Sequence, residues 1–287
     1  MRRRWTTPLL VAACAVVLPA LAACAVPASA GLPDGVTVDV LQGRTDYTSG
    51  TLVIRIVNES AEELLVSSAS LDAPGFAEPA TWDRGTTVRA GTTVDLRAAV
   101  PEQDCTQASG RPRVELTTGA GDRRTTVTVE AADPLGTLER LHGTGCIATL
   151  VDRVAQISVG PPVVEGVGTA SVAVLPLSLA PTGADGSVET AGIGSTPLLR
   201  PAQDAGGDGN GWPVTLTVDA ASAPVTVPLR IVPARCDPHA IAEDKIGTVL
   251  VISVTLSDGS TGDYRVTPPE DIREALLDFV REHCGMA

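Results

Sequence analysis

Aromatic residues are rare in this chain. Its 287 residues include three tryptophans, two tyrosines and two phenylalanines. Platforms that stack nucleotide bases or sugars need several aromatic faces, and this composition offers too few of them. Trp82 and Trp212 fall at similar places in the two halves of the chain, so we expect each to anchor a hydrophobic core.

Catalytic and cofactor signatures are also missing from the sequence. No G-x-S-x-G elbow, phosphate-binding loop or dinucleotide fingerprint occurs. The single lysine, Lys245, has no serine three residues before it. We therefore expect a protein that is not an enzyme, with no catalytic residues and no cofactor.

Histidine is limited to three positions, each within four residues of a cysteine. Cys236, His239, His283 and Cys284 offer the ligand types of a tetrahedral zinc site. The first half has Ala108 where His239 would correspond. Zinc would therefore explain one half of the chain, whereas disulfides explain both, and we predict no metal here.

The segment from Asp204 to Gly211 superficially resembles calcium loops, in which oxygen ligands alternate with glycine. Its candidate ligands are Asp204, Asp208 and Asn210. The spacing of the two aspartates departs from the EF-hand pattern, and no glutamate closes the loop. We interpret the segment as an acidic turn and regard the three residues as weak metal candidates only.

Basic side chains are outnumbered by acidic ones. The chain has 21 Lys and Arg against 34 Asp and Glu, for a formal net charge of −13. Such a balance repels nucleic acid and anionic lipid headgroups. We expect no nucleic-acid partner.

The first 24 residues have the pattern of an export signal. Arg2, Arg3 and Arg4 precede an apolar run that begins at Leu9, and this run is too short to cross a bilayer as a helix. The run closes on Leu21-Ala22-Ala23-Cys24, which resembles the lipobox of bacterial lipoproteins.

That resemblance implies a signal peptide over 1–23 and a lipid on Cys24, followed by an anchor linker over 24–30. The mature protein would sit on the outer face of the bacterial cytoplasmic membrane, held by its N-terminal lipid. An alternative is cleavage after Ala28-Ser29-Ala30, an A-x-A site, which would release a secreted soluble protein. Cys14 lies in the apolar run and is discarded in both cases.

A degenerate internal repeat organises the rest of the chain. The stretch 93–97 (TVDLR), then Val100-Pro101 and Cys105, has the same order as 226–230 (TVPLR), Val232-Pro233 and Cys236. We place two domains at 31–146 and 147–287.

Alternation of apolar and polar residues dominates both halves. Runs rich in Val, Ile and Thr are separated by Gly, Pro, Asp and Asn, which is typical of antiparallel strands with one buried face. The predicted fold is mainly β, with two tandem antiparallel β-sandwich (Ig-like) domains of roughly seven strands each. Each domain is expected to end in a short disulfide-tethered helix.

The two terminal helices have different sequence support. In the second half, Thr267 is the expected N-cap, and Ile272, Leu276, Phe279 and Val280 fall on one helical face. In the first half Asp133 is the expected cap, and a narrower stripe comprises Leu135, Leu138 and Leu141. Gly143 is expected to end this helix, which we predict to be the shorter and looser copy.

Four cysteines remain besides those of the leader. An exported chain meets an oxidising compartment, so two disulfides are expected. Four cysteines allow three pairings, and duplication favours Cys105–Cys146 and Cys236–Cys284, because each repeat then has its own crosslink.

These features indicate a non-catalytic, membrane-anchored envelope lipoprotein that acts as a binding or scaffolding module. Its partner would be an unknown envelope protein or small molecule. We expect the binding surface on inter-strand loops or at the domain junction near 147–165. The alternatives are an envelope hydrolase with dispersed carboxylates and a solute-binding lipoprotein.

Overall fold

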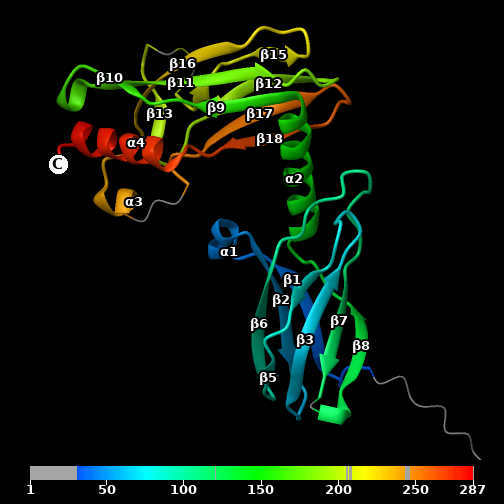
Figure 1. Ribbon diagram of the computed structural model, residues 1–287. Helices are drawn as coiled ribbons and strands as arrows, with labels where there is room; N and C mark the ends of the chain where they lie inside the picture. The colour runs from blue at the N-terminus through cyan, green and yellow to red at the C-terminus, as the bar shows by residue number, and fades with distance from the viewer. Residues whose placement is uncertain (1–30, 120, 205, 207–208, 243–245, 287) are drawn as a thin grey trace, which may run out of the picture.

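The computed structural model describes residues 31–119, 121–204, 206, 209–242 and 246–286 (Figure 1). The predicted signal peptide over 1–23, the linker over 24–30 with Cys24, and the candidate ligand Asp208 lie outside these residues. None of the described helices is both long and apolar enough to cross a membrane.

The first domain is a sandwich of two antiparallel sheets. The smaller sheet has the order β1-β2-β6 and consists of β1 (Val36–Leu41), β2 (Thr51–Asn58) and β6 (Thr92–Ala99). The larger has the order β4-β3-β7-β8, with β5 also paired to β3; its strands are β3 (Leu64–Asp72), β4 (Ala80–Trp82), β5 (Thr86–Val88), β7 (Arg113–Thr118) and β8 (Thr125–Glu130). The short helices α1 (Arg44–Ser49) and η1 (Gly121–Arg123) lie in connections.

The second domain is also a sandwich of two antiparallel sheets. One sheet contains β9 (Ala155–Val159), β10 (Val163–Glu165), β11 (Val172–Pro181), β13 (Leu199–Pro201) and β16 (Val225–Pro233). The other contains β12 (Ser187–Gly194), β14 (Gly211–Trp212), β15 (Leu216–Asp219), β17 (Leu250–Leu256) and β18 (Thr261–Val266). Its helices are η2 (Gly168–Ala170), α3 (Pro238–Ala242) and α4 (Glu270–His283).

The two sandwiches share one topology. The order β1-β2-β6 recurs as β10-β11-β16, with β9 also paired to β11, and β4-β3-β7-β8 recurs as β14-β12-β17-β18. Even a register shift recurs, between Val66 and Ser68 in the first domain and between Thr190 and Gly192 in the second. The predicted mainly β fold of two tandem antiparallel sandwiches is therefore confirmed.

Within the described residues the strands number eight and ten, more than the seven or so expected. Short strands account for the excess in both domains. In the second, β9 and β10 together take the place of β1, and β13 is an additional strand paired with β16.

Alternating apolar residues form the two cores, as the sequence pattern predicts. Leu52, Ile54 and Ile56 of β2 are fully buried in the first, and Leu175, Leu177 and Leu179 of β11 in the second. Trp82 and Trp212 belong to these cores, and Trp212 donates its indole N–H to the carbonyl of Arg230 at 3.0 Å.

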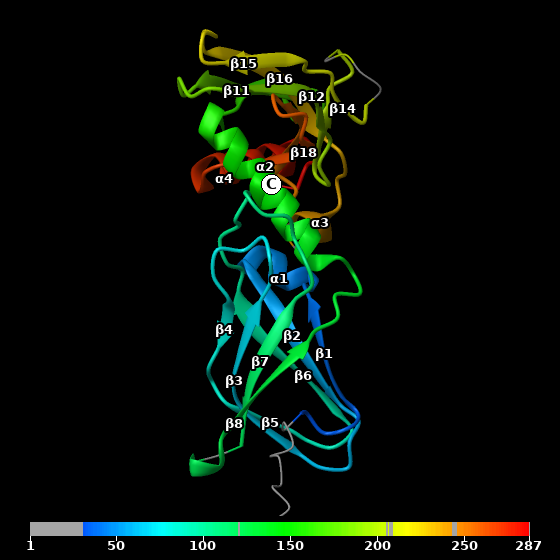
Figure 2. The same cartoon turned by 90° about the vertical axis from the view of Figure 1, so that its right-hand side faces the viewer.

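Helix α2 (Thr137–Val154) differs from its prediction in length. Its N-cap residue is Gly136 and not the predicted Asp133, although the carboxylate of Asp133 accepts hydrogen bonds from the backbone N–H groups of Thr137 (2.7 Å) and Leu138 (2.9 Å). The helix does not end at Gly143 but runs for 18 residues. It reaches from the first sandwich to the second (Figure 2), and the proposed domain boundary at 146/147 falls inside it.

Burial explains why α2 continues through two glycines. Gly143 and Gly145 each destabilise a helix by about 1 kcal/mol relative to alanine. Ile147, Val151 and Val154 are buried in the second core, and each such burial contributes about 2 kcal/mol. The prediction that this helix is the shorter copy was wrong, because α2 has 18 residues and α4 has 14.

The two ends of α2 serve different cores. Leu138, 2% exposed, belongs to the first core, and Leu141 packs against it. Leu135, which the sequence placed on the same stripe, precedes the helix and is 71% exposed. The helix therefore joins the cores of both sandwiches.

Helix α4 has the buried face that its sequence predicts: Ile272, Leu276, Phe279 and Val280 all belong to the second core. The prediction of Thr267 as its cap was wrong, because the N-cap residue is Pro269 and no side chain caps it.

Both predicted disulfides are present. Cys105 and Cys146 are 41 residues apart in sequence and join the loop after β6 to α2. Cys236 and Cys284 are 48 residues apart and join the loop after β16 to the end of α4. Each sandwich thus has one crosslink to the helix that follows it.

We expect the two disulfides to stabilise the protein to similar extents, because they close loops of 41 and 48 residues. Chain entropy gives about 4 kcal/mol for each. Replacing Cys105 and Cys146 with serine, or Cys236 and Cys284 with serine, should lower the free energy of unfolding by comparable amounts in calorimetry. Peptide mapping that joins Cys105 to Cys236 or Cys284, or a crosslink whose removal costs no stability, would contradict this account.

Candidate binding groove

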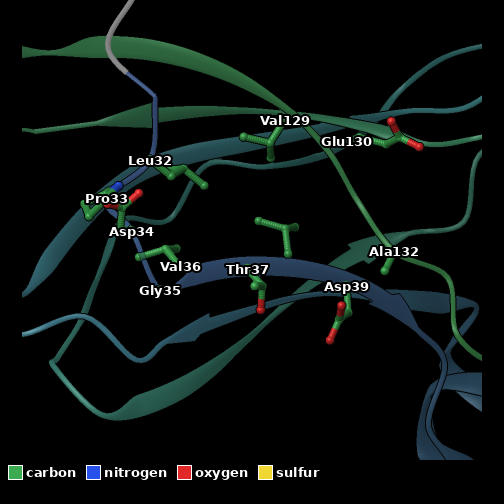
Figure 3. A pocket seen from close by; sticks show the side chains of 11 residues that line it. Leu32, Pro33, Asp34, Gly35, Val36, Thr37, Asp39, Val129, Glu130 and Ala132 are labelled. Carbon is green, nitrogen blue, oxygen red and sulfur yellow. The ribbon is translucent and has the colours of Figure 1, made fainter.

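The candidate site lies between β1 and β8, the edge strands of the two sheets of the first sandwich. A parallel bridge joins them between Asp39 and Ala132. Here the N–H of Val40 donates to the carbonyl of Ala132 at 2.7 Å, and the N–H of Ala132 donates to the carbonyl of Val38 at 2.9 Å. Next to this bridge, a groove of about 560 Å³ opens between the strands (Figure 3).

The interior of this groove is apolar. Val38 is 4% exposed, and Leu32, Val36 and Val129 are half-buried side chains that pack against the first core. Figure 3 shows Leu32 and Val129 in the space between the two strands. The groove therefore gives access to the edge of the first core.

Charged side chains surround the apolar interior. Asp34, Asp39 and Glu130 line the groove. The guanidinium of Arg111 lies 3.0 Å from Glu130, and Arg55 of β2 is directly opposite Asp39 in the ladder. Three carboxylates against two guanidinium groups leave the rim acidic.

The corresponding edge of the second sandwich is in contact with a helix. Its edge strands are β9, which takes the place of the first half of β1, and β18, which takes the place of β8. These two strands contact each other, and helix α2 contacts both of them. In Figure 1 α2 crosses the direction of the strands at the end of the second sandwich.

Close packing and one hydrogen bond hold α2 against β18. Ile147 lies so close to Gly262 of β18 that a Cβ on this glycine would come within 2.8 Å of Ile147 Cγ1. The hydroxyl of Tyr264 donates to Asp152 Oδ1 at 2.5 Å. Burial of the phenol, and then its hydrogen bond to Asp152, raises the pKa of Tyr264 well above its ordinary value.

The predicted junction surface near 147–165 is divided between buried and exposed residues. Residues 147–155 belong largely to α2 and the second core, so most of their apolar side chains are not available for binding. Beyond them Val163, Val164 and Val167 are exposed at and just after β10. The exposed apolar residues of this range therefore lie in its second part.

The candidate metal ligands do not come together in the described structure. Asp204 forms an ion pair with Arg230 at 3.0 Å, and the carbonyl of Asn210 accepts the N–H of Ser195. Cys236 and Cys284 are joined to each other. Among the described residues no group of three His, Cys, Asp or Glu side chains is placed to hold a metal ion.

Two histidines lie beside the disulfides instead. His142 Nε2 is 3.2 Å from the carbonyl of Asp104, and its ring packs edge-on against Phe76. His283 Nδ1 is 3.0 Å from the carbonyl of Ser171, and its ring packs edge-on against Phe279. Their contacts hold the ends of α2 and α4 against neighbouring loops.

Sequence reasoning missed the groove residues, because no local motif marks them.

Comparisons with known proteins identify no family. No family model matches the chain, and no curated protein matches it. Similar solved structures include red sea bream transglutaminase, at 10% identity over 83% of this chain and 32% of that one, with a TM-score of 0.21. A chain of the chaperone and tip subunit complex of Acinetobacter baumannii Csu pili is similar over 82% of this chain and 100% of its own length, at 9% identity and a TM-score of 0.19.

The B domain of a biofilm-associated protein is similar at 9% identity, over 79% of this chain and 82% of that one, with a TM-score of 0.21. This chain spans about a third of the length of the transglutaminase. At TM-scores near 0.2 these likenesses support no argument about fold or function.

The contact between Tyr264 and Asp152 predicts a pH dependence. A tyrosine whose pKa is raised by folding contributes stability that is fully present below about pH 10, its unfolded value, and is lost as the pH rises toward the folded value. Tyr264→Phe should lower the free energy of unfolding by about 1 kcal/mol at neutral pH and make the decline above about pH 10 shallower.

Urea unfolding at a series of pH values measures both effects. Tyr47→Phe is the matched control, because that ring is 53% exposed and stacks under the guanidinium of Arg140. If the free energy of unfolding falls equally steeply above about pH 10 in the wild-type protein and in Tyr264→Phe, the prediction is contradicted.

Proposed function

We propose that this protein is a non-catalytic lipoprotein, anchored on the outer face of the bacterial cytoplasmic membrane, that binds or scaffolds another envelope protein. The lipobox-like end of the leader supports the anchor. The observation that supports binding most directly is the groove between β1 and β8, which opens to solvent beside the first core.

The position of the groove supports the same proposal. Figure 1 shows that the described chain begins at the end of the first sandwich opposite the second domain. Leu32, at this end, lines the groove. With Cys24 lipidated, the seven residues 24–30 extend at most about 25 Å, so the groove would face partners close to the membrane.

A rigid connection between the domains suits a scaffold. Helix α2 contributes Leu138 to the first core and Val151 to the second. The disulfide between Cys105 and Cys146 also attaches the middle of α2 to the first domain. The second sandwich would therefore be held at a defined orientation away from the membrane.

A hydrolase has less support in the described residues. One carboxylate, Asp46, is buried there. It accepts hydrogen bonds from Arg97 Nε at 2.9 Å and from the backbone N–H of Gly43 at 2.9 Å. It thus serves an ion pair, and no second buried carboxylate accompanies it among these residues to supply an acid and a base.

A solute receptor also has less support. Small-molecule sites enclose most of the ligand surface, whereas the groove lies open along the edge of the sandwich (Figure 3). A polypeptide partner fits an open edge better than a small solute does.

The anchor is tested by Cys24→Ala, which should abolish lipidation and shift the protein out of the membrane fraction or leave the precursor uncut. Cys14→Ala is the matched control and should leave the membrane fraction unchanged. Mass spectrometry should find a mature N-terminus at Cys24 that bears diacylglycerol. A mature form that begins at unmodified Gly31 would contradict the anchor.

Chemical crosslinking of intact cells tests the binding role. The anchored protein should crosslink reproducibly to a defined envelope protein, and Cys24→Ala should lose that product. A protein that crosslinks to no envelope component would contradict the proposed function.

A further inference from the structure

A short stretch of α2 lies between the two hydrophobic cores. Leu141 is the last residue of the helix that packs against the first core, and Ile147 is the first that is buried in the second. Residues 142–146 belong to neither core and include Gly143 and Gly145. Glycine weakens a helix interior and is a common site of bending. This stretch is therefore the point at which α2 would bend most readily.

The loop after β6 holds this stretch against the first sandwich. Cys105 of the loop is bonded to Cys146 of the helix. Gln103 of the same loop lies so close to Gly145 that a Cβ on this glycine would overlap its side chain. The disulfide is the covalent part of this attachment, and it joins α2 directly after the two glycines.

His142 adds noncovalent contacts to the same attachment. Its Nε2 lies 3.2 Å from the carbonyl oxygen of Asp104, and its ring packs edge-on against Phe76. Its Nε2 also lies 3.5 Å from Cys146 Sγ. The histidine therefore connects the helix, the loop and the sulfur of the disulfide.

We propose that the Cys105–Cys146 disulfide is a reducible restraint on a hinge at Gly143–Gly145, and that a dithiol reductant releases it. While the disulfide is formed, α2 is fixed to the loop of the first sandwich on the far side of both glycines. Once it is reduced, α2 bends at the glycines, and the second sandwich changes its orientation relative to the first. This device does not depend on the groove or on its partner.

The contact of His142 with the sulfur makes this disulfide reactive. Its Nε2 bears the hydrogen, because the carbonyl oxygen of Asp104 accepts hydrogen bonds and cannot donate them. A thiolate at Cys146, 3.5 Å from that nitrogen, would receive a hydrogen bond. Such a bond stabilises the thiolate, and a stabilised thiolate leaves a disulfide faster.

The second disulfide is similarly exposed but has a different neighbour. Cys236, like Cys105, is exposed, and its partner Cys284 is half-buried. His283 precedes Cys284 in the chain, but its Nδ1 lies 3.0 Å from the carbonyl and 3.2 Å from the hydroxyl of Ser171. This disulfide also lies entirely within the second domain. It is therefore an internal control for both the reactivity and the hinge.

The reduction is an ordinary thiol–disulfide exchange. One thiolate of the dithiol attacks Sγ of the exposed Cys105, forms a mixed disulfide with it and releases Cys146 as a thiolate, which takes up a proton. The second thiolate of the dithiol attacks the dithiol sulfur of the mixed disulfide and releases Cys105, which is protonated in turn. The protein gains two electrons and two protons, and the dithiol becomes a disulfide.

Reduction of the purified mature protein by dithiothreitol, a small dithiol, tests the reactivity. Alkylation of the freed thiols and mass spectrometry give the rate for each disulfide. Cys105–Cys146 should be reduced about tenfold faster than the other pair. His142→Leu, which removes the donor, should slow this reaction several-fold, and the matched His283→Leu should leave it unchanged. A purely structural His142 would give the opposite result, because its loss would loosen the loop and raise the rate.

Distances between spin labels test the hinge. The labels are attached through non-natural amino acids at Thr93 and Thr217, exposed residues of the first and second sandwich, so that the cysteines stay unlabelled. The oxidised protein should give one narrow distance distribution. Reduction should broaden it and add a second population. Gly143→Ala should narrow the distribution of the reduced protein, because alanine stiffens the helix and its Cβ would meet nothing within 4 Å.

Serine variants separate the two disulfides. Replacing Cys105 and Cys146 should broaden the distances without any reductant, whereas replacing Cys236 and Cys284 should leave them narrow. Equal reduction rates for the two disulfides would overturn the inference, as would a distance distribution that reduction does not change. A broad distribution that Gly143→Ala does not narrow would place the motion elsewhere and overturn the hinge. Loss of β-sheet circular dichroism on reduction would also overturn it, because the disulfide would then serve stability alone.

Discussion

The burial of one face of α2 against the second sandwich is the interaction on which the rest of this structure depends. Ile147, Val151 and Val154 are buried in the second core, and α2 contacts both β9 and β18. The free energy of that burial exceeds the cost of Gly143 and Gly145 inside the helix. It also makes α2 a shared element, because Leu138 belongs to the first core.

The shared helix gives the two copies of the fold different edges. The second sandwich is contacted at β9 and β18 by the helix that connects the domains. At the edge between β1 and β8 of the first sandwich, the described residues form a groove with an apolar interior and an acidic rim. Duplication explains the common topology of the two domains.

Much of the fold follows from the sequence, because its signals are local or repeated. Period-2 alternation predicts strands such as β2 and β11, and the repeated order around Cys105 and Cys236 predicts the disulfides. The end of α2 was not predictable from Gly143, since residues of the second sandwich stabilise the helix beyond it. The groove was missed because Leu32 and Val129 become neighbours only once the two sheets pack.

Hydrogen exchange along α2 tests the central claim most directly. Amides that exchange only when a whole domain unfolds report the stability of that domain. If α2 is part of both cores, amides of 147–154 should exchange as slowly as those of β11 and β17. Removing Val151 by substitution with alanine should speed their exchange together with that of these strands. Rapid exchange from Gly143 onward, with β11 and β17 still protected, would contradict the account and make the second half of α2 a simple linker.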